Sequence, residues 1–219
     1  MDTEALTQTR LFAGIQKEDM DAVLSCMNAC EKSYKKDEII MHAGDTTQEL
    51  GLVLSGSVNI TVNYQWGASS IIGRAGRGMI FSENYAAIPD RELLCDVIAA
   101  ENSTILFLNM DKLLTVCGTG CAFHNQVIHN LIRISAEKSL ELSTRMMHTA
   151  PKTIRARVIS YLSEQAMRSG HCKLDIPFSR QQLADYLDVD RSALSAELSS
   201  MQKDGLLRYH KNHFEMLPD

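Results

Sequence analysis

A run of small polar and basic side chains near the C-terminus, residues 191 to 199, has the composition of a surface that recognises DNA bases. One arginine, three serines and an alanine fall on the face opposite its leucines: Arg191, Ser192, Ser195, Ala196 and Ser199. An arginine donates two hydrogen bonds to guanine, a serine hydroxyl bonds base edges or phosphates, and an alanine contacts the thymine methyl group. The pattern predicts a helix whose first turns enter the major groove of DNA.

A second group of reactive side chains lies in the segment CGTGCAFH, residues 117 to 124. Cys117, Cys121 and His124 share one face if the segment is helical, and thiolates with an imidazole suit zinc, iron or a redox pair. Gly118 and Gly120 favour a loop instead, and the spacing offers no fourth ligand. We therefore predict no metal here and interpret these residues as small apolar fillers with a capping histidine. A redox or metal sensor at this cluster is the alternative.

The same segment raises a second alternative, a thiol enzyme with Cys117 or Cys121 as the nucleophile and His124 as its base. The sequence offers no residue to orient that base and no oxyanion site. We therefore expect no enzymatic activity.

Two short helices are expected to position the arginine- and serine-rich face. Ser179 followed by Gln182 matches a capping box, so a helix begins at Arg180. Asp190 is a second N-cap, and only a few residues separate the two helices. Each helix has an apolar stripe, comprising Leu183, Ala184 and Leu187, then Leu194, Leu198 and Met201. Two capped helices that share one small core across a tight turn form a helix-turn-helix.

After Gly205 ends the second helix, the segment LLRYHKNHFEML has two β-rich runs around Lys211-Asn212. This pattern predicts a hairpin wing, with Arg208, His210 and Lys211 available to the DNA backbone. A helical hairpin that binds only a protein is the alternative for the whole C-terminal region.

The chain before this region divides into a β-rich segment and a long helix. Residues 18–30 have helical spacing, with Cys26 and Cys30 on the apolar side. Between Ile39 and Leu108, short β-rich runs alternate with glycines at turn-like intervals, which indicates an antiparallel barrel or roll. Helical spacing returns after Leu113 and persists to about Pro151.

The long helix is expected to be longer than its own domain can cover. About 25 residues span roughly 37 Å at 1.5 Å per residue. An identical helix in a parallel dimer is the simplest partner for the uncovered apolar stripe. We expect that contact at Ile128, Leu131, Ile132 and Leu142. A long helix lying across its own domain is the alternative.

Composition favours a cytoplasmic protein with its acidity in the N-terminal part. The 219 residues have a formal net charge of −5, yet residues 150–219 contain 10 Lys and Arg against 9 Asp and Glu. The sequence has no secretion signal and no apolar stretch of the roughly 18 residues that a membrane helix needs. In a cytoplasmic chain the six cysteines are expected to be reduced.

Two stretches of this sequence resemble one protein family. FSRQQLADYLDVDRSALSAELSSMQKDGLL resembles the winged helix-turn-helix of the CRP/FNR family of bacterial transcription regulators. AGDTTQELGLVLSGSVNI resembles the start of their cyclic-nucleotide-binding-like β-roll. The resemblance implies an α+β fold with an N-terminal antiparallel β-roll of double-stranded jelly-roll type, a long central dimerisation helix and a C-terminal winged helix-turn-helix. The boundaries implied are 1–115, 116–149 and 150–219.

The resemblance also implies partners and contact residues. It implies a homodimer that binds a palindromic operator in double-stranded DNA, senses a small effector in the roll and contacts RNA polymerase. Ser179, Arg180 and Gln181 fall on phosphate-contacting positions, and Arg191, Ser192 and Ala196 fall on base-recognising ones. Ala196 is a departure, because many members have an arginine there, and its loss makes the operator unpredictable from relatives. A protein-binding module that has lost operator binding is therefore a further alternative.

We predict that the roll does not bind cyclic AMP by the contacts usual in the family. Members that bind it have a Gly-Glu pair and then an Arg-Ser or Arg-Thr pair for the cyclic phosphate. Here Ser82 replaces the glycine before Glu83, and Leu93 and Leu94 occupy the places of the second pair. A phosphate without a cationic partner is poorly compensated for its lost hydration. A two-residue shift of the loop would bring Arg91 back to the phosphate position.

The remaining prediction for the roll is an apolar or weakly polar pocket. Phe81, Tyr85, Leu94 and Cys95 would line it, and it would suit a small aromatic or acyl ligand. The sequence identifies neither that ligand nor a cofactor.

Overall fold

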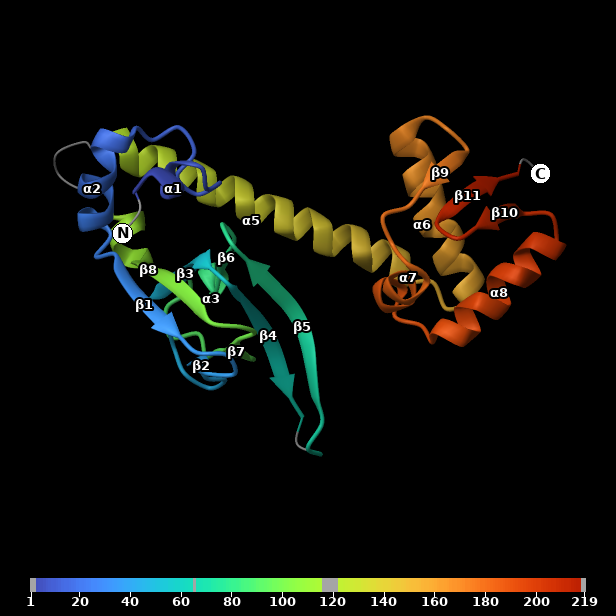
Figure 1. Cartoon of the computed structure of the whole chain (residues 1–219), viewed down its shortest axis with the longest axis horizontal. Helices are drawn as coiled ribbons and strands as arrows, with labels where there is room; N and C mark the ends of the chain where they lie inside the picture. The colour runs from blue at the N-terminus through green and yellow to red at the C-terminus, as the bar shows by residue number, and fades with distance from the viewer. Residues whose placement is uncertain (1–2, 65, 116–121, 218–219) are drawn as a thin grey trace. The chain divides into compact units, whose positions relative to one another are not determined.

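The computed structural model describes residues 3–64, 66–115 and 122–217, and the chain divides into two compact units, Met1–Ala136 and Glu137–Asp219. Figure 1 shows that the first unit is rich in strands, whereas the second consists of helices and a small sheet. One helix, α5 (Ala122–Thr149), begins in the first unit and ends in the second, and its 28 residues confirm the predicted long helix. None of the helices in the described ranges is both long and apolar enough to cross a membrane.

The strands of the first unit form two antiparallel sheets. One sheet has the strand order β1-β8-β3-β6 and the other the order β2-β7-β4-β5. The strands are β1 (Cys30–Tyr34), β2 (Ile39–Met41), β3 (Glu49–Ser55), β4 (Ser57–Asn63), β5 (Ser69–Gly76), β6 (Ile80–Phe81), β7 (Asp96–Ala99) and β8 (Ser103–Asn109). Apolar side chains from both sheets, such as Val58 of β4 and Ile105 of β8, form one buried cluster. This arrangement confirms the predicted antiparallel roll.

The turn between β3 and β4 explains one of the glycines that punctuate the sequence. Gly56 has a φ of +75°, a left-handed conformation that glycine adopts without strain. A Cβ atom at this position would lie 2.5 Å from the carbonyl oxygen of Asn102 and 2.3 Å from Oγ of Ser103. The close approach of two turns therefore requires glycine here.

Helices cover the outer face of the β1-β8-β3-β6 sheet. They are α1 (Thr3–Thr7), α2 (Lys17–Cys26), α4 (Met110–Leu114) and the beginning of α5, while the short helix α3 (Glu83–Ala86) follows β6. Val127, Leu131 and Ile134 of α5 join the apolar cluster on this face, and Leu131 is 7% exposed. Leu131 therefore belongs to the core of its own unit and not to the uncovered face where the sequence analysis placed it.

The first predicted helix is shorter than its pattern indicated. Helix α2 ends at Cys26, and Asn28 has a φ of +48°, which ends the helical conformation. Cys30 begins β1 and pairs with Phe107 of β8. Cys26 and Cys30 are both exposed, so the prediction that the helix buries them was wrong. The helical spacing extends by chance beyond the end of α2 into β1, which pairs with β8.

The second unit consists of a helix-turn-helix and a three-stranded sheet. After the end of α5 come α6 (Ile154–Ser169), β9 (Lys173–Asp175), α7 (Arg180–Leu187), α8 (Arg191–Lys203), β10 (Leu207–His210) and β11 (His213–Met216). The sheet has the order β10-β11-β9, so the predicted hairpin wing is confirmed and β9 extends it. Strand β9 was not predicted, because three residues are too short for a recognisable alternation.

Both predicted helix caps are present. Ser179 Oγ accepts a hydrogen bond from the backbone N–H of Gln182, whose side chain accepts one from the N–H of Ser179. The Asp190 carboxylate accepts hydrogen bonds from the backbone N–H groups of Ser192 and Ala193. Between the helices, Asp188 has a φ of +54°, and this left-handed C-cap ends α7. The apolar stripes of α7 and α8 are buried together, as predicted.

Candidate functional site

The first turns of α8 present the face that the sequence analysis proposed for DNA. Arg191, Ser192, Ala196 and Ser199 are exposed and Ser195 is half-buried. Leu194, Leu198 and Met201 on the other side lie in the core of the second unit. The structure therefore brings the predicted base-recognising residues together on one polar, solvent-facing surface.

The serine hydroxyls of this surface form hydrogen bonds within the helix. Ser195 Oγ donates to the carbonyl oxygen of Arg191 at 2.9 Å, and Ser199 Oγ donates to that of Ser195 at 3.0 Å. Ser192 Oγ donates to the carboxylate of Asp190. All three side chains are thus held close to the helix backbone in the free protein.

Arg180, at the start of α7, lies against the wing. Its guanidinium carbon is 5.0 Å from the ring centroid of Tyr209 and 5.6 Å from that of Phe214. One of its N–H groups donates to the carbonyl oxygen of Lys211 at 3.3 Å. Burial lowers the pKa of the Arg180 guanidinium from its usual value. The predicted phosphate-contacting arginine therefore joins α7 to the wing hairpin by cation–π contacts.

The other predicted phosphate-contacting residues are exposed beside it. Ser179 is the N-cap of α7, and Gln181 donates a hydrogen bond from Nε2 to the carboxylate of Asp185 at 2.8 Å. Ser179, Gln181 and Arg191 are all exposed, which leaves them accessible to a ligand.

Two arginines of α6, neither of them predicted from the sequence, bind the helix-turn-helix on the side of α6. Arg157 donates to the carbonyl oxygens of Pro151, Leu187 and Asp188 at 2.8, 2.9 and 2.8 Å. It thereby satisfies carbonyl groups that the end of α7 leaves without helical partners. Sequence spacing gives no signal for such contacts, because the partners of Arg157 lie up to 31 residues away.

The second of these arginines, Arg155, binds the second half of α8. Arg155 forms ion pairs with Glu197 at 2.6 Å and Asp204 at 2.7 Å, and it donates to Ser200 Oγ at 3.1 Å. The two carboxylates raise the pKa of the Arg155 guanidinium by accepting its hydrogen bonds. Helix α8 is therefore tied to α6 along its second half.

The end of α5 packs on α7 through a cluster of rings. His148 is 2% exposed, its Nδ1 lies 2.9 Å from the hydroxyl oxygen of Tyr186, and its ring meets Tyr161 edge-on at 5.4 Å. Burial lowers the pKa of His148 from its usual value. Arg145 of α5 donates to the carbonyl oxygens of Asp185 and Tyr186. The last turns of α5 and helix α7 thus form one packed block within the second unit.

In the roll, the predicted effector residues do not share one environment. Phe81 and Glu83 are buried at 1% and 4% exposure, and Leu93 is also buried, whereas Leu94 is 65% exposed. Cys95 is buried, which raises the pKa of its thiol, and Tyr85 is half-buried. Leu94 is therefore exposed to solvent in the ligand-free chain, whereas Phe81 and Cys95 lie in its interior. The apolar pocket that these residues would line stays a prediction.

The helix that follows β6 starts without the glycine of the cyclic-nucleotide binders. Ser82 caps α3 with a φ of +54°, so it holds the left-handed conformation that a glycine would adopt without strain. Ser82 Oγ donates to the sulfur of Met41 at 3.2 Å. Ser82 therefore has a backbone conformation in which glycine would be the less strained residue.

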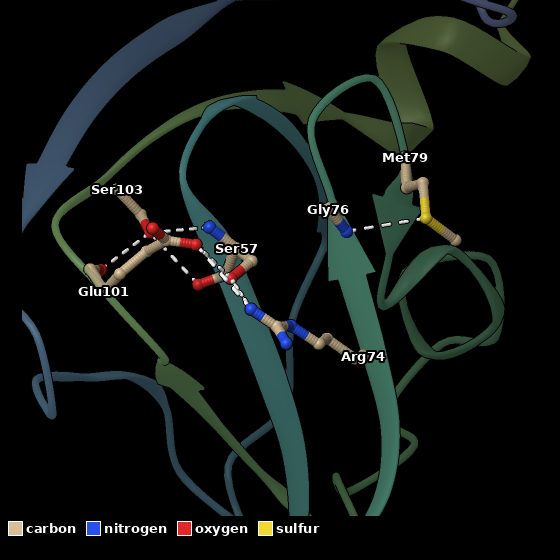
Figure 2. A network of polar contacts seen from close by, with 6 residues as sticks. All are labelled: Ser57, Arg74, Gly76, Met79, Glu101 and Ser103. Atoms are coloured by element: carbon tan, nitrogen blue, oxygen red, sulfur yellow. Dashed lines mark hydrogen bonds and ion pairs between the residues drawn. The ribbon is translucent and has the colours of Figure 1, made fainter. Parts of the chain in front are cut away.

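The cationic side chain of Arg74 in the roll takes part in a network of polar contacts (Figure 2). Arg74 of β5 donates to Ser57 Oγ at 2.7 Å and lies 3.7 Å from the Glu101 carboxylate. Ser57 in turn donates to Glu101 at 2.6 Å, and Ser103 donates to the carbonyl oxygen of Ser57. The guanidinium therefore has internal partners. Arg91, the predicted replacement cation for the cyclic phosphate, is exposed.

The reactive cluster predicted before the long helix is described only in part. Cys117 and Cys121 lie outside the described residues, and His124 is 3% exposed in α5. Among the residues that the structure describes, no group of three or more His, Cys, Asp and Glu side chains is arranged to hold a metal ion.

Two known domain families match the chain in the order of its two units. Residues 31–119 match the cyclic nucleotide-binding domain, and residues 156–217 match the Crp-like helix-turn-helix domain. The cyclic AMP receptor protein of Thermus thermophilus is 25% identical over 198 residues, which cover 90% of this chain and 88% of that protein. The transcriptional activator protein FnrL of Cereibacter sphaeroides is 19% identical over 196 residues, covering 80% and 71%.

Solved structures share the fold. The catabolite activator protein of Thermus thermophilus superposes with a TM-score of 0.52 at 22% identity, covering 95% of this chain and 94% of that one. CprK superposes with a TM-score of 0.61 at 13% identity, covering 89% and 88%. A β-roll, a long helix and a winged helix-turn-helix follow one another in this chain, and each domain match falls on the expected unit. The chain therefore belongs to the CRP/FNR family of transcription regulators, with a cyclic-nucleotide-binding domain followed by a Crp-like helix-turn-helix domain.

Proposed function

We propose that this protein is a homodimer that recognises a palindromic operator with α8 and responds to an effector other than cyclic AMP bound in the usual way. Its working parts are the sensor roll (1–115), the dimerisation helix (116–149) and the DNA-binding domain (150–219). A two-fold symmetric pair of recognition helices requires half-sites about one turn of DNA apart. As a family regulator it would then act on transcription together with RNA polymerase.

The observation that supports operator recognition is the polar face of α8 on a rigid support. Arg191, Ser192, Ser195 and Ala196 share that face. The N-cap, the α6 arginines and the buried stripe fix the helix beneath it, and a fixed helix loses little entropy when it docks. Arg191 is our candidate for a bidentate contact to guanine, and Ser179, Arg180 and Gln181 are our candidates for phosphate contacts.

The support for dimerisation is a seam along α5. Positions spaced alternately by four and three residues, as in a coiled coil, are Ile128, Ile132, Ser135, Ser139, Leu142 and Met146. Ile132, Leu142 and Met146 are 60%, 65% and 69% exposed in the single chain. Large apolar side chains aligned on one exposed helix face favour burial against a partner. A second copy of α5 presents the same seam.

The support for a different effector comes from the residues at the phosphate position. Leu93 is buried and apolar where cyclic-nucleotide binders have an arginine, and Arg74 is already paired with Glu101. A cyclic phosphate would lose hydration there without gaining a cation. The cluster of Cys117, Cys121 and His124 is the alternative sensor, and the experiment below tests it through its redox arm.

Operator recognition is tested by selecting bound sequences from a random duplex library at near-physiological salt. We expect a palindrome with half-sites about 10 base pairs apart. Arg191→Ala should weaken binding to that palindrome by about 10- to 100-fold and leave binding to a scrambled duplex unchanged. Gln181→Ala should weaken both duplexes by the same factor, because a phosphate contact is independent of sequence. Arg168→Ala, an exposed arginine of α6 outside the DNA face, is the control.

The selection is run with protein kept in reductant and with protein after mild oxidation. Loss of the palindrome on oxidation alone would support a thiol sensor, for which the cluster of Cys117, Cys121 and His124 is our candidate. If no motif emerges in either state, operator recognition is refuted and the protein-binding module gains support. Titration with cyclic AMP should leave the affinity for the palindrome unchanged.

Dimerisation is tested by light scattering of variants of α5. Leu142→Glu should halve the mass in solution, because it places a charge in the seam of both copies. Leu140→Glu is a matched control, since Leu140 is equally exposed, at 67%, but lies off the seam. A dimer that survives Leu142→Glu, or that dissociates equally with Leu140→Glu, would contradict the proposed interface.

A further inference from the structure

A groove in the second unit has a combination of side chains that DNA binding does not use. It has a volume of about 500 Å³ and lies among the last part of α5, α6, the segment before α7, and α7 itself. Three aromatic residues form part of its lining: Tyr161, Phe178 and Tyr186. Three glutamates line it as well: Glu137, Glu141 and Glu164. The lining thus combines aromatic rings with excess negative charge.

The aromatic side chains form one compact cluster. The ring centroids of Phe178 and Tyr186 are 5.0 Å apart, and each lies within 5.9 Å of the ring of Tyr161. Tyr161 is almost fully buried, whereas Phe178 and Tyr186 are half-buried. Burial raises the pKa of Tyr161 to about 12, with Tyr186 and Glu164 adding to the effect. The rings are therefore neutral at physiological pH and present π-systems in a negative field.

The charge of the lining favours cations. Arg168 is the one basic residue among the described lining residues, and it is paired with Glu164 at 3.1 Å. Glu141 is exposed at the edge of the groove. An anion would meet an excess of carboxylates here, and a neutral apolar ligand would displace water from them without compensation.

A cation already sits on this cluster from within the protein. The guanidinium carbon of Arg145 lies 5.7 Å from the ring centroid of Tyr186. This contact shows that the electrostatic potential of the ring accommodates a positive charge. Aromatic rings beside carboxylates are also the chemistry by which proteins bind quaternary ammonium groups.

We propose that this groove binds a small organic cation, a quaternary or protonated amine on an apolar body. The rings would contact the cation by cation–π attraction, and Glu141 would supply the compensating charge, since Glu164 is already paired with Arg168. The groove does not compete with the dimerisation seam. At 100° per residue, Glu137, Leu140, Glu141 and Thr144 fall on nearly the opposite face of α5 from the seam positions.

Occupation of the groove would have a regulatory consequence that rests on the function proposed above. The ligand would touch α5, α6 and α7 at once, and α7 packs directly on the recognition helix. By bridging these elements it would restrict the motion of α7 and so change the affinity for the operator. Binding of the cation itself does not depend on DNA, so it is measured without DNA.

The test is calorimetric titration of the full chain with choline at constant ionic strength, alongside its neutral isostere 3,3-dimethylbutan-1-ol. We expect one saturable site per chain for choline and no saturable binding of the alcohol. Glu141→Gln should weaken choline binding about threefold, and Tyr186→Leu about tenfold. Phe178→Leu gives an independent measurement if the loss of the Tyr186 ring prevents folding. Glu215→Gln, the same charge change on the wing, is the matched control.

Three outcomes would overturn the proposal. They are the absence of saturable choline binding by the folded wild-type chain, equal binding of the neutral alcohol, and equal weakening by Glu215→Gln and Glu141→Gln. Each can occur while operator selection succeeds, and operator selection can fail while choline binds. The experiments therefore test the cation site and operator recognition independently of each other.

Discussion

Replacing Arg157 by methionine removes a support of the helix-turn-helix while keeping a side chain of similar length. Three carbonyl oxygens, those of Pro151, Leu187 and Asp188, then lose the hydrogen bonds that the guanidinium donates to them. Methionine fills the same apolar space along the stem, so the packing of α6 changes little. The expected effect is therefore a local loosening of the turn before α8.

The magnitude follows from the burial of those carbonyls. The bonds to Pro151 and Leu187 are part-buried, and the bond to Asp188 is exposed. A hydrogen bond to a charged group contributes about 1.5–3 kcal/mol when it is shielded, whereas an exposed carbonyl exchanges it for water at little cost. Two shielded bonds at the lower figure give about 3 kcal/mol. Since 1.36 kcal/mol is a factor of ten, this is roughly a hundredfold change in an opening equilibrium.

Hydrogen exchange of backbone amides, measured on the full chain by mass spectrometry, checks this value. Peptides that cover α7 and the turn should lose about a hundredfold in protection, and peptides of the roll should not change. Arg157→Lys should give an intermediate loss of protection, because an ammonium group cannot bind at once the separate carbonyl oxygens that the planar guanidinium reaches. Arg208→Met, an exposed arginine on the wing, is the control. If Arg157→Met alters protection no more than Arg208→Met does, the support we infer for the turn is absent.

Three further predictions concern a turn, a cap and a buried histidine. Gly56→Ala should destabilise the roll by at least about 3 kcal/mol, because its methyl group would overlap the Asn102 carbonyl; an unchanged thermal transition by circular dichroism would refute this. Ser179→Ala should cost about 1 kcal/mol in urea unfolding, and Ser179→Asn should restore most of it. Because burial lowers the pKa of His148 below its usual 6.5, only the unfolded chain gains this proton as the pH first falls below 6.5. The second unit should therefore lose stability progressively as the pH falls below 6.5, and His148→Gln should remove this part of the pH dependence of the urea midpoint.

The local features of the fold were predictable from the sequence because their causes are local. The capping box at Ser179, the N-cap at Asp190 and the hairpin around Lys211-Asn212 each depend on a few adjacent residues, and all three are present. The end of α2 was not predictable, since Asn28 adopts a left-handed conformation and Cys30 pairs with a strand far away in the sequence. Helical spacing alone cannot reveal competition from a strand.

The candidate site divides in the same way. The exposed face of α8 followed from periodicity, because the residues opposite the buried leucines of one helix must face outward. The contacts of Arg157 and the position of Arg180 on Tyr209 connect residues about 30 apart, and no spacing rule links them. Leu131 and Ile132 show the limit of a stripe analysis: both are apolar neighbours on α5, but packing buries one and exposes the other.

The bonding of the α8 serines has a consequence for which bases they can discriminate. A hydroxyl has a single proton, and Ser192, Ser195 and Ser199 each direct it to an oxygen of the protein. Toward the solvent these hydroxyl oxygens present only lone pairs, which accept hydrogen bonds from the exocyclic amino groups of adenine and cytosine. Guanine and thymine present acceptors in the same positions and would oblige each serine to give up its internal bond. We therefore expect the half-site to contain a guanine opposite Arg191 and amino-bearing bases where the serines approach the groove.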